Sequence, residues 1–175
     1  PVCTRGTRRG ILYSIGEENI TIKGEGIING GGKNWWNSGV DDGERPRTVQ
    51  FIRCSRIRIE GISIINSPCW TINPICCTDV VVSGITIRNP YESPNTDGIN
   101  PESCKNVRIS DCCVDVGDDC ITIKSGLETD ILQKQSPCEN ITVTNCTLIH
   151  GHGGVVIGSE MSGGIRNVAI SNCVF

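Results

Sequence analysis

One pattern of hydrophobic and polar positions recurs along the chain. Each copy has a polar residue, two aliphatic residues separated by one mostly polar position, a further polar position, and then Gly, Asn or Asp. The copies occupy residues 19–24, 56–61, 79–84, 106–111, 140–145 and 167–172. Alternation with a period of two places the aliphatic pair on one face of a β-strand and the polar residues on the other. The pattern therefore predicts a set of equivalent strands with one inward face.

Two further apolar runs accompany each strand of this set. The first follows a Gly, Asn or Asp, residue types that tolerate the left-handed backbone of a tight corner. Its two inward positions hold Ile62, Ile85, Cys112, Cys146 and Cys173, and then Ile64, Ile87, Val114, Leu148 and Phe175. The other run repeats at residues 48–50, 71–73 and 98–100, each ahead of a cysteine at 54, 77 or 104. Three strands thus belong to each repeat.

The spacing of the repeats predicts the architecture. Successive copies start 23 to 37 residues apart, which fits one turn of a β-solenoid per copy. We therefore predict an all-β fold, a right-handed parallel β-helix of about six coils that forms a single domain over residues 1–175. Excursions at residues 30–47 and 128–137 are expected to be surface loops. Because the chain starts at Pro1 without a signal-peptide pattern and stops at Phe175 inside a strand-like run, we expect an internal piece truncated at both ends.

Composition and charge exclude several classes of function. Twenty-one glycines, with only two Phe and two Tyr, favour short strands and tight turns over a helix bundle. The net charge of −3 and the pI near 5.4 give no basis for a nucleic-acid partner. No apolar run approaches the ~18 residues that a membrane span requires, so no membrane association is expected. We expect the full-length protein to be a monomer.

The twelve cysteines are placed mostly inside apolar runs, not in loops. Cysteine is among the residue types most often fully buried, and a small thiol suits a crowded stack. We therefore expect mostly free, stacked thiols, with Cys76 and Cys77 on opposite faces of their strand, and likewise Cys112 and Cys113. No Cys-x2-Cys pair faces a second such pair, so zinc is not expected, and neither is any other metal or cofactor.

Acidic residues and a histidine precede the third strand of three successive repeats. The motifs are Asn95-Thr96-Asp97-Gly98, Gly117-Asp118-Asp119-Cys120 and Gly151-His152-Gly153. Stacked strands lie ~4.8 Å apart, so Asp97 and the Asp118-Asp119 pair should lie within roughly 5 to 10 Å, with His152 beside them. Like charges so close favour one protonated carboxyl near neutral pH, which could protonate a leaving oxygen. Gly98, Gly117, Gly151 and Gly153 are expected to leave space for a ligand.

Each motif alone is ordinary turn chemistry, because Asp-Gly and Asp-Asp are common in solvated turns. Three matching positions on successive coils favour a functional site instead. A non-catalytic β-solenoid, such as an adhesin or a carbohydrate-binding module, remains an alternative that needs only the stacked strands. A pectate lyase on the same architecture is less favoured, since it would need Ca²⁺ and a base such as Arg within the acidic cluster.

The three motifs, in this order on a β-helix, resemble the signature of the polygalacturonases, glycoside hydrolase family 28. The resemblance covers nearly all of the chain. It implies hydrolysis of α-1,4-linked galacturonate in pectin, polygalacturonate or oligogalacturonides, with inversion at the anomeric carbon. It also implies that Asp118 is the general acid, that Asp97 and Asp119 activate the water, and that His152 supports the protonation state of the acid.

The resemblance also implies further sequence features of the family, some of which this chain contains and others of which it lacks. A further Arg-Ile-Lys motif that grips the substrate carboxylate is expected one coil beyond Phe175. Endo-acting members often pair the cysteine after Asp-Asp with one before Gly-His-Gly, but residues 148–150 offer no cysteine, so a disulfide at Cys120 is doubtful. Residues 153–160 resemble exo-acting and bacterial members more. The family implies a secreted or cell-wall-associated protein, although unpaired cysteines would also suit an intracellular one.

Several residues around the motifs are candidates for binding the substrate. They are Asn95, Trp70, Lys124, Gly151, Gly153 and Glu160. Trp35 and Trp36 suit either sugar stacking or packing against the end of the coil. Arg45 and Arg47 are interpreted as surface charges.

Overall fold

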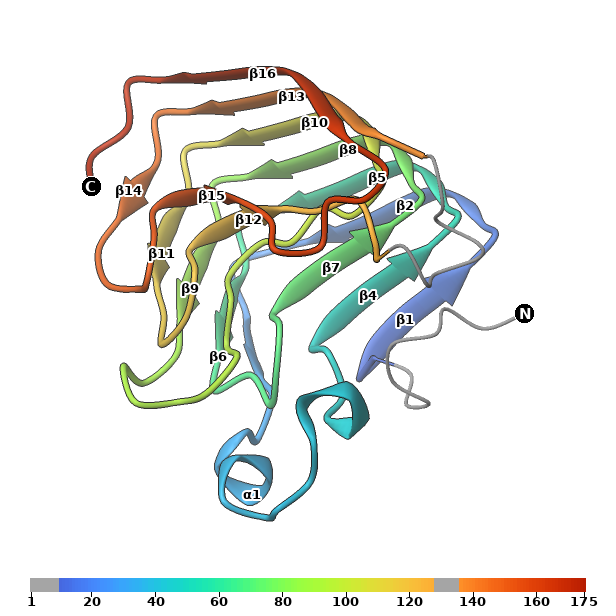
Figure 1. Cartoon of the computed structure of the whole chain (residues 1–175). Coiled ribbons are helices and arrows are strands. Elements are labelled where there is room, and N and C mark those ends of the chain that lie inside the picture. Colours follow the sequence, from blue (N-terminus) through green and yellow to red (C-terminus); the bar gives the residue numbers. More distant parts are fainter. Residues whose placement is uncertain (1–9, 128–135) are drawn as a thin grey trace.

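The computed structural model describes residues 10–127 and 136–175. The start of the chain at Pro1, and residues 128–135 of the second predicted loop, lie outside the described residues. The other predicted loop, residues 30–47, contains the short helix α1 (Lys33–Trp36) and the 3₁₀ turn η1 (Asp42–Glu44). In Figure 1 this connection projects from one side of the stacked coils.

The described strands are all parallel and form stacked sheets that wind around one core (Figure 1). The largest sheet contains β2 (Glu18–Lys23), β5 (Ser55–Glu60), β8 (Thr78–Ser83), β10 (Lys105–Ser110), β13 (Cys138–Thr144) and β16 (Ile165–Ser171). The second contains β3 (Ile27–Asn29), β6 (Ser63–Ile65), β9 (Thr86–Arg88), β11 (Cys113–Asp115) and β14 (Thr147–Leu148). The third face consists of β1 (Leu12–Ile15), β4 (Val49–Ile52) and β7 (Ile72–Ile75), then β12 (Ile121–Ile123) and β15 (Val155–Ile157). Isolated bridges at Ile99 join these two parts of the third face.

The register of the strands is the one that the repeats predict. Ile57 pairs with Val80, Val80 with Val107, and Val107 with Ile141. On the third face Val49 pairs with Ile72, which is bridged to Ile99. These side chains are at most 1% exposed, and burying each stabilises the fold by about 1.5–3 kcal/mol. The prediction of a right-handed parallel β-helix with about six coils is confirmed.

The corners of the coil show both expected and unexpected left-handed residues. Positive φ was predicted at the last residue of each repeat, and Asp111, Asn145 and Asn172 have φ of 57°, 54° and 52°. The first residue of each repeat is also left-handed, with φ of 59° at Asn140 and 57° at Asn167. The Asn167 side chain donates to the side chain of Asn140 at 3.0 Å, so an amide ladder follows this edge.

The cysteines form ladders in the core, as predicted. All eleven cysteines of the described residues are free. One ladder runs through Cys54, Cys77, Cys104 and Cys138, and another through Cys112, Cys146 and Cys173. Cys77 is fully buried while its neighbour Cys76 is partly exposed, so the two thiols do point to opposite faces. Cys120 is free, and its thiol donates to the backbone oxygen of His150 at 3.0 Å.

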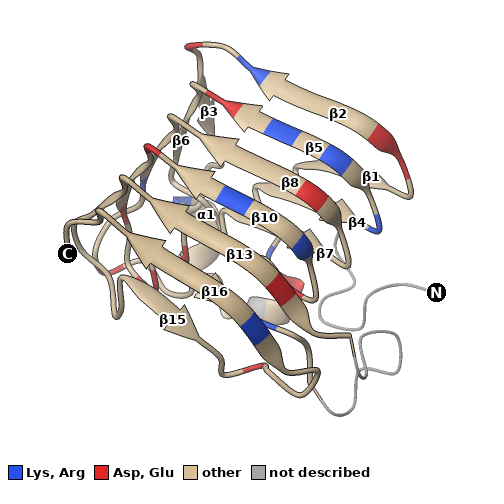
Figure 2. Ribbon diagram, turned by 90° about the horizontal axis from the view of Figure 1, so that it is seen from above, with Lys and Arg blue, Asp and Glu red and all other residues tan. Residues whose placement is uncertain are grey.

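The outer face of the six-stranded sheet is a solvated surface of mixed charge (Figure 2). Glu139 pairs with Lys105 at 3.1 Å and with Arg166 at 2.5 Å across neighbouring strands. Exposed pairs of this kind contribute about 0–1 kcal/mol each. Among the described residues, no helix has the length and apolar character needed to cross a membrane.

Candidate active site

The acidic motifs converge at one corner, where the coil enters its third face. The Gly98 amide donates to the Asp119 oxygen at 2.9 Å, and the Cys120 amide donates to the Gly153 oxygen at 2.8 Å. These bonds stack Asp97, Asp119 and Gly153 on successive coils. One carboxylate oxygen each of Asp97, Asp118 and Asp119 lies within 4.8 Å of the other two. The three carboxylates are therefore together, as predicted, but closer than the expected 5 to 10 Å.

Asp97 is the buried member of the cluster, with 3% exposure. Its Oδ2 accepts hydrogen bonds from Asn100 Nδ2 at 2.7 Å and from Thr122 Oγ1 at 3.2 Å. Burial, together with the negative charge of Asp118, raises the pKa of Asp97 to about 6. Asp97 therefore changes charge near neutral pH, as expected for one member of a close acidic group.

Asp119 and Asp118 are both more exposed than Asp97. Burial and the charge of Asp118 raise the pKa of Asp119, while Lys124 and His152 act in the opposite direction. Asp118 Oδ1 accepts the backbone N–H of Asp119 at 2.9 Å. One Asp118 oxygen is thus held by the protein, and within the described residues no hydrogen bond to the other is present.

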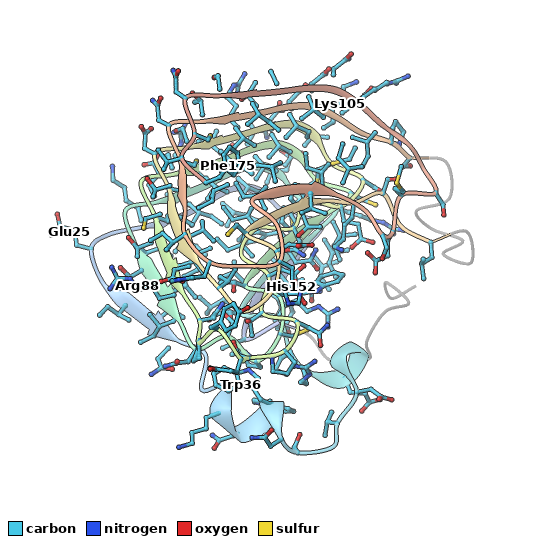
Figure 3. The ribbon with its side chains drawn as sticks, turned by 60° about the vertical axis from the view of Figure 1, so that its left-hand side comes forward. Glu25, Trp36, Arg88, Lys105, His152 and Phe175 are labelled. Carbon is cyan, nitrogen blue, oxygen red and sulfur yellow. The ribbon has the colours of Figure 1, made fainter. Side chains whose placement is uncertain are left out.

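His152 joins the cluster through Asp118. Its Nδ1 lies 3.3 Å from Asp118 Oδ1, and its backbone N–H donates to the Asp118 backbone oxygen at 3.1 Å. Figure 3 shows His152 away from Lys105, which lies on the six-stranded sheet. His150 instead pairs with Asp115 at 2.9 Å. The structure therefore brings together the catalytic candidates Asp97, Asp118, Asp119 and His152.

The glycines of the motifs make room for the protein's own chain. A Cβ at Gly98 would collide with the Cys120 backbone oxygen, at Gly117 with the Ser93 oxygen, and at Gly151 with the Asp118 oxygen. Close approach of neighbouring backbones thus requires these three glycines, and the expectation that they also leave space for a ligand stays a prediction. Gly153 borders the site itself, since a Cβ there would lie 3.4 Å from Asp119 Oδ1.

Lys124, Glu160 and Trp70 form a buried group beside the acids. Lys124 Nζ donates to Glu160 Oε2 at 2.7 Å and to the Gly158 oxygen at 3.1 Å. The ammonium also lies 4.8 Å from the centroid of the Trp70 ring. Each of the three residues is 5% exposed, so their predicted contact with substrate would involve only a small surface.

The interpretation of Arg45 and Arg47 as surface charges is wrong, because they are 4% and 3% exposed. Arg47 lies over the Trp70 ring at 4.5 Å from its centroid. The Arg45 guanidinium contacts Asn95, the first residue of the Asp97 motif. Trp36 packs beside Gly32, and its Nε1 donates to the Ser67 oxygen at 3.0 Å, which fits packing at the end of the coil.

Sequence reasoning also missed Asn100 and Thr122, the two donors to Asp97. Both lie on the third face, and both are fully buried. The sequence did contain a signal for them. Gln50 and Asn73 are polar residues at the equivalent position of the preceding third strands. Such residues are buried only where they have hydrogen-bond partners.

The three carboxylates are also close enough together to hold a metal ion. Two donors already reach Asp97, and the charge of Lys124 lowers the pKa of both Asp97 and Asp119. These groups stabilise negative charge without a metal ion. The absence of a functional metal stays a prediction, which chelation tests.

A parallel β-helix with three carboxylates and a histidine at one corner defines the class of β-helical glycoside hydrolases. The chain belongs to family 28 of the glycosyl hydrolases, whose family model matches residues 7–175.

Relatives with known names are consistent with this membership. The chain is 35% identical to a probable polygalacturonase of Vitis vinifera, over 97% of this chain and 35% of that protein. The structure of an exopolygalacturonase from Thermotoga maritima is 34% identical with a TM-score of 0.88, over 99% of this chain and 49% of that one. A polygalacturonase structure from Erwinia carotovora, at 24% identity and a TM-score of 0.78, shares the fold. The chain thus spans about a third to a half of the length of these relatives.

Proposed function

We propose that the protein hydrolyses α-1,4-linked galacturonate in polygalacturonate or in oligogalacturonides, with inversion at the anomeric carbon. One observation carries the proposal: Asp97, Asp118 and Asp119 lie within 4.8 Å of one another in a family 28 fold. Two carboxyl groups with different protonation are the general requirement for cleaving a glycosidic bond. His152, in contact with Asp118, completes the group.

Asp118 acts as the general acid. Its Oδ1 is held by the Asp119 amide and lies beside His152, and Oδ2 is therefore the oxygen proposed to face the substrate. The proton on Asp118 passes to the glycosidic oxygen as the bond from C1 to that oxygen breaks. His152 is largely exposed, and it then helps to transfer a proton from solvent to Asp118, which returns to its protonated state.

Asp97 and Asp119 activate the water that attacks C1. The side-chain donors Asn100 and Thr122 both bind Asp97 Oδ2, and Oδ1 is the oxygen proposed to accept a proton from the water. A carboxylate with a pKa of about 6 is a stronger base than an ordinary aspartate, and it is ionised above that pH. The water oxygen bonds to C1 and its proton passes to a carboxylate, which balances the proton that Asp118 delivers.

Inversion is proposed from family membership. In most inverting enzymes the two carboxyl groups are ~6.5–9.5 Å apart. One oxygen of each carboxylate in this cluster lies within 4.8 Å of the other two, so their separation is not the evidence for inversion. The stereochemistry of the first product is therefore a separate test of the mechanism.

Cleavage from the chain end is the proposed mode of action. The support is the similarity to the exopolygalacturonase of Thermotoga maritima, at 34% identity over nearly the whole chain. Asn95, Trp70, Lys124, Gly151, Gly153 and Glu160 are proposed to line the bound sugar or to support the residues that do. Release of only short products from polygalacturonate would support this mode, and rapid loss of viscosity would oppose it.

The Asp118→Asn variant of the full-length protein tests the catalytic assignment. We expect roughly 10³-fold lower kcat with binding of polygalacturonate retained, because Asn has no proton to donate. Asp111→Asn is the matched control, since Asn145 and Asn172 already occupy the equivalent corner with similar φ. A non-catalytic β-solenoid would show no cleavage in the parent protein. Equal activity of both variants would remove Asp118 from the mechanism.

A further inference from the structure

Arg45 is a buried cation that reaches the active-site corner from a distant part of the sequence. It follows η1, before β4, and its side chain lies against the Asp97 motif two repeats later. Nη1 donates to the backbone oxygens of Pro68 at 3.0 Å and Pro94 at 2.8 Å. Nη2 donates to Asn95 Oδ1 at 2.5 Å. No aspartate or glutamate of the described residues forms an ion pair with Arg45.

The contact with Arg45 determines how the Asn95 side chain is oriented. A guanidinium has five donors and no acceptor, so only the oxygen of the Asn95 amide can face it. The Asn95 nitrogen, Nδ2, is therefore turned away from Arg45. No hydrogen bond of Nδ2 to the described part of the chain is present, and Asn95 is half-exposed. An oriented donor thus remains available two residues before Asp97.

The segment around Asn95 is fixed from its other side as well. Asn95 has a left-handed φ of 56°. The next residue, Thr96, is fully buried, donates to the Ser93 oxygen at 2.9 Å and accepts the Gly117 amide at 3.3 Å. Thr96 therefore ties the segment to the coil that carries Asp118, while Arg45 ties it to the preceding coils. Little freedom is left to the Asn95 backbone.

We propose that Arg45 is a positioning residue: it holds the Asn95 amide so that Nδ2 donates a hydrogen bond to an oxygen of the galacturonate unit bound next to Asp97. The inference rests on the proposed hydrolysis of galacturonate. Arg45 itself does not touch the reacting atoms. A buried guanidinium costs free energy to desolvate, and its charge also favours an anionic sugar at this corner.

A purely structural role for Arg45 predicts different behaviour. Its bonds to the Pro68 and Pro94 oxygens would then matter alone, and its loss would lower stability without depending on Asn95. A positioning role makes the two side chains act as one unit. The loss of either should then remove most of what the other contributes.

A double-mutant cycle in the full-length protein distinguishes the two roles. We expect Arg45→Met and Asn95→Ala each to lower kcat/KM for trigalacturonate by roughly tenfold, mainly through KM, because each removes one oriented hydrogen bond. The double variant should be no more than about twofold worse than either single variant. Arg45→Lys keeps the positive charge but not the planar guanidinium with its forked donors, and it should recover only part of the lost kcat/KM. If Arg45→Met does not fold by its thermal unfolding curve, Arg45→Lys takes its place in the cycle.

Arg47 provides the matched control, since it is buried in the same segment, where it donates to the Arg45 backbone oxygen at 3.1 Å and lies over the Trp70 ring. The factor by which Arg47→Met lowers kcat/KM should be the same with and without Asn95→Ala, so that the two effects multiply. Multiplicative effects of Arg45 and Asn95 would overturn the positioning role while leaving hydrolysis intact. Absence of any cleavage by the parent protein would instead overturn the proposed function, and this inference with it.

Discussion

Nδ1 of His152 lies 3.3 Å from Oδ1 of Asp118, and 69% of the His152 side chain is exposed against 21% for Asp118. The imidazole therefore connects a partly buried carboxyl to solvent. An imidazole can both accept and donate a proton, so His152 can carry protons between solvent and this carboxyl between turnovers. This contact supports the proposal that His152 supplies protons and that Asp118 donates the proton in the bond-breaking step.

The first prediction concerns His152→Ala. We expect kcat to fall by roughly 10²-fold with a smaller change in KM, because proton transfer is affected more than binding. His150→Ala is the control, since His150 pairs with Asp115 outside the acidic cluster. Steady-state kinetics on trigalacturonate measure both. Equal losses in the two variants would argue against a specific role for His152.

The second prediction is the acidic limit of activity. Asp97 must be ionised to accept a proton from water, and its pKa is raised to about 6. We therefore expect kcat/KM to rise with pH up to about 6. A profile of kcat/KM against pH checks this expectation. A rate that is constant from pH 4 to 6 would exclude Asp97 as the base.

The third prediction follows from the same shift and concerns stability. The pKa of Asp97 is raised from 3.8 to about 6, so between these values the folded state retains a proton that the unfolded state has lost. Stability from this group is present at low pH and is lost as pH rises toward 6, by up to about 3 kcal/mol. Asp97→Asn should thus gain stability relative to the parent protein at pH 7 but not at pH 3.5. Urea unfolding of the full-length protein at both pH values measures it, and an equal difference at both would contradict the burial argument.

The fourth prediction separates two roles for Lys124. Its charge lowers the pKa of Asp97 and Asp119, so removing it should move the acidic limit of kcat/KM to higher pH. Lys124→Met is best combined with Glu160→Gln, because a buried glutamate without its partner would destabilise the fold. Glu160→Gln alone is the control. An unchanged acidic limit with a raised KM would instead support direct contact between Lys124 and the substrate.

The fifth prediction concerns metals. The hydrogen bonds to Asp97 and the charge of Lys124 should suffice without a metal ion, so excess EDTA is expected to leave kcat unchanged. Added Ca²⁺ should not increase it. Loss of activity on chelation, with recovery on adding Ca²⁺, would favour a metal-dependent lyase.

Much of the fold was predictable because a β-helix repeats its packing on every coil. The inward pairs, such as Val80 and Val82, identify one strand, and their recurrence gives the register of the next. The acidic corner followed from the same register, since Asp97 and Asp119 precede equivalent strands. Local pattern and global stacking agree throughout this part of the chain.

The remaining features depend on contacts between segments that share no pattern. Arg45 lies in an irregular connection, where a charged residue is expected to be exposed to solvent. Only the fold places its Nη2 atom 2.5 Å from Asn95 Oδ1. Asn100 and Thr122 look like ordinary polar strand positions until Asp97 is placed beside them. The glycines of the motifs allow the backbones of neighbouring coils to approach, which a repeat pattern does not reveal.

The configuration of the first product from trigalacturonate, followed by NMR with the full-length protein, tests the central claim most directly. We predict a saturated product whose new reducing end forms first as the β anomer, which then mutarotates. Initial formation of the α anomer, or of an unsaturated sugar, would contradict single-step hydrolysis by Asp97, Asp118 and Asp119.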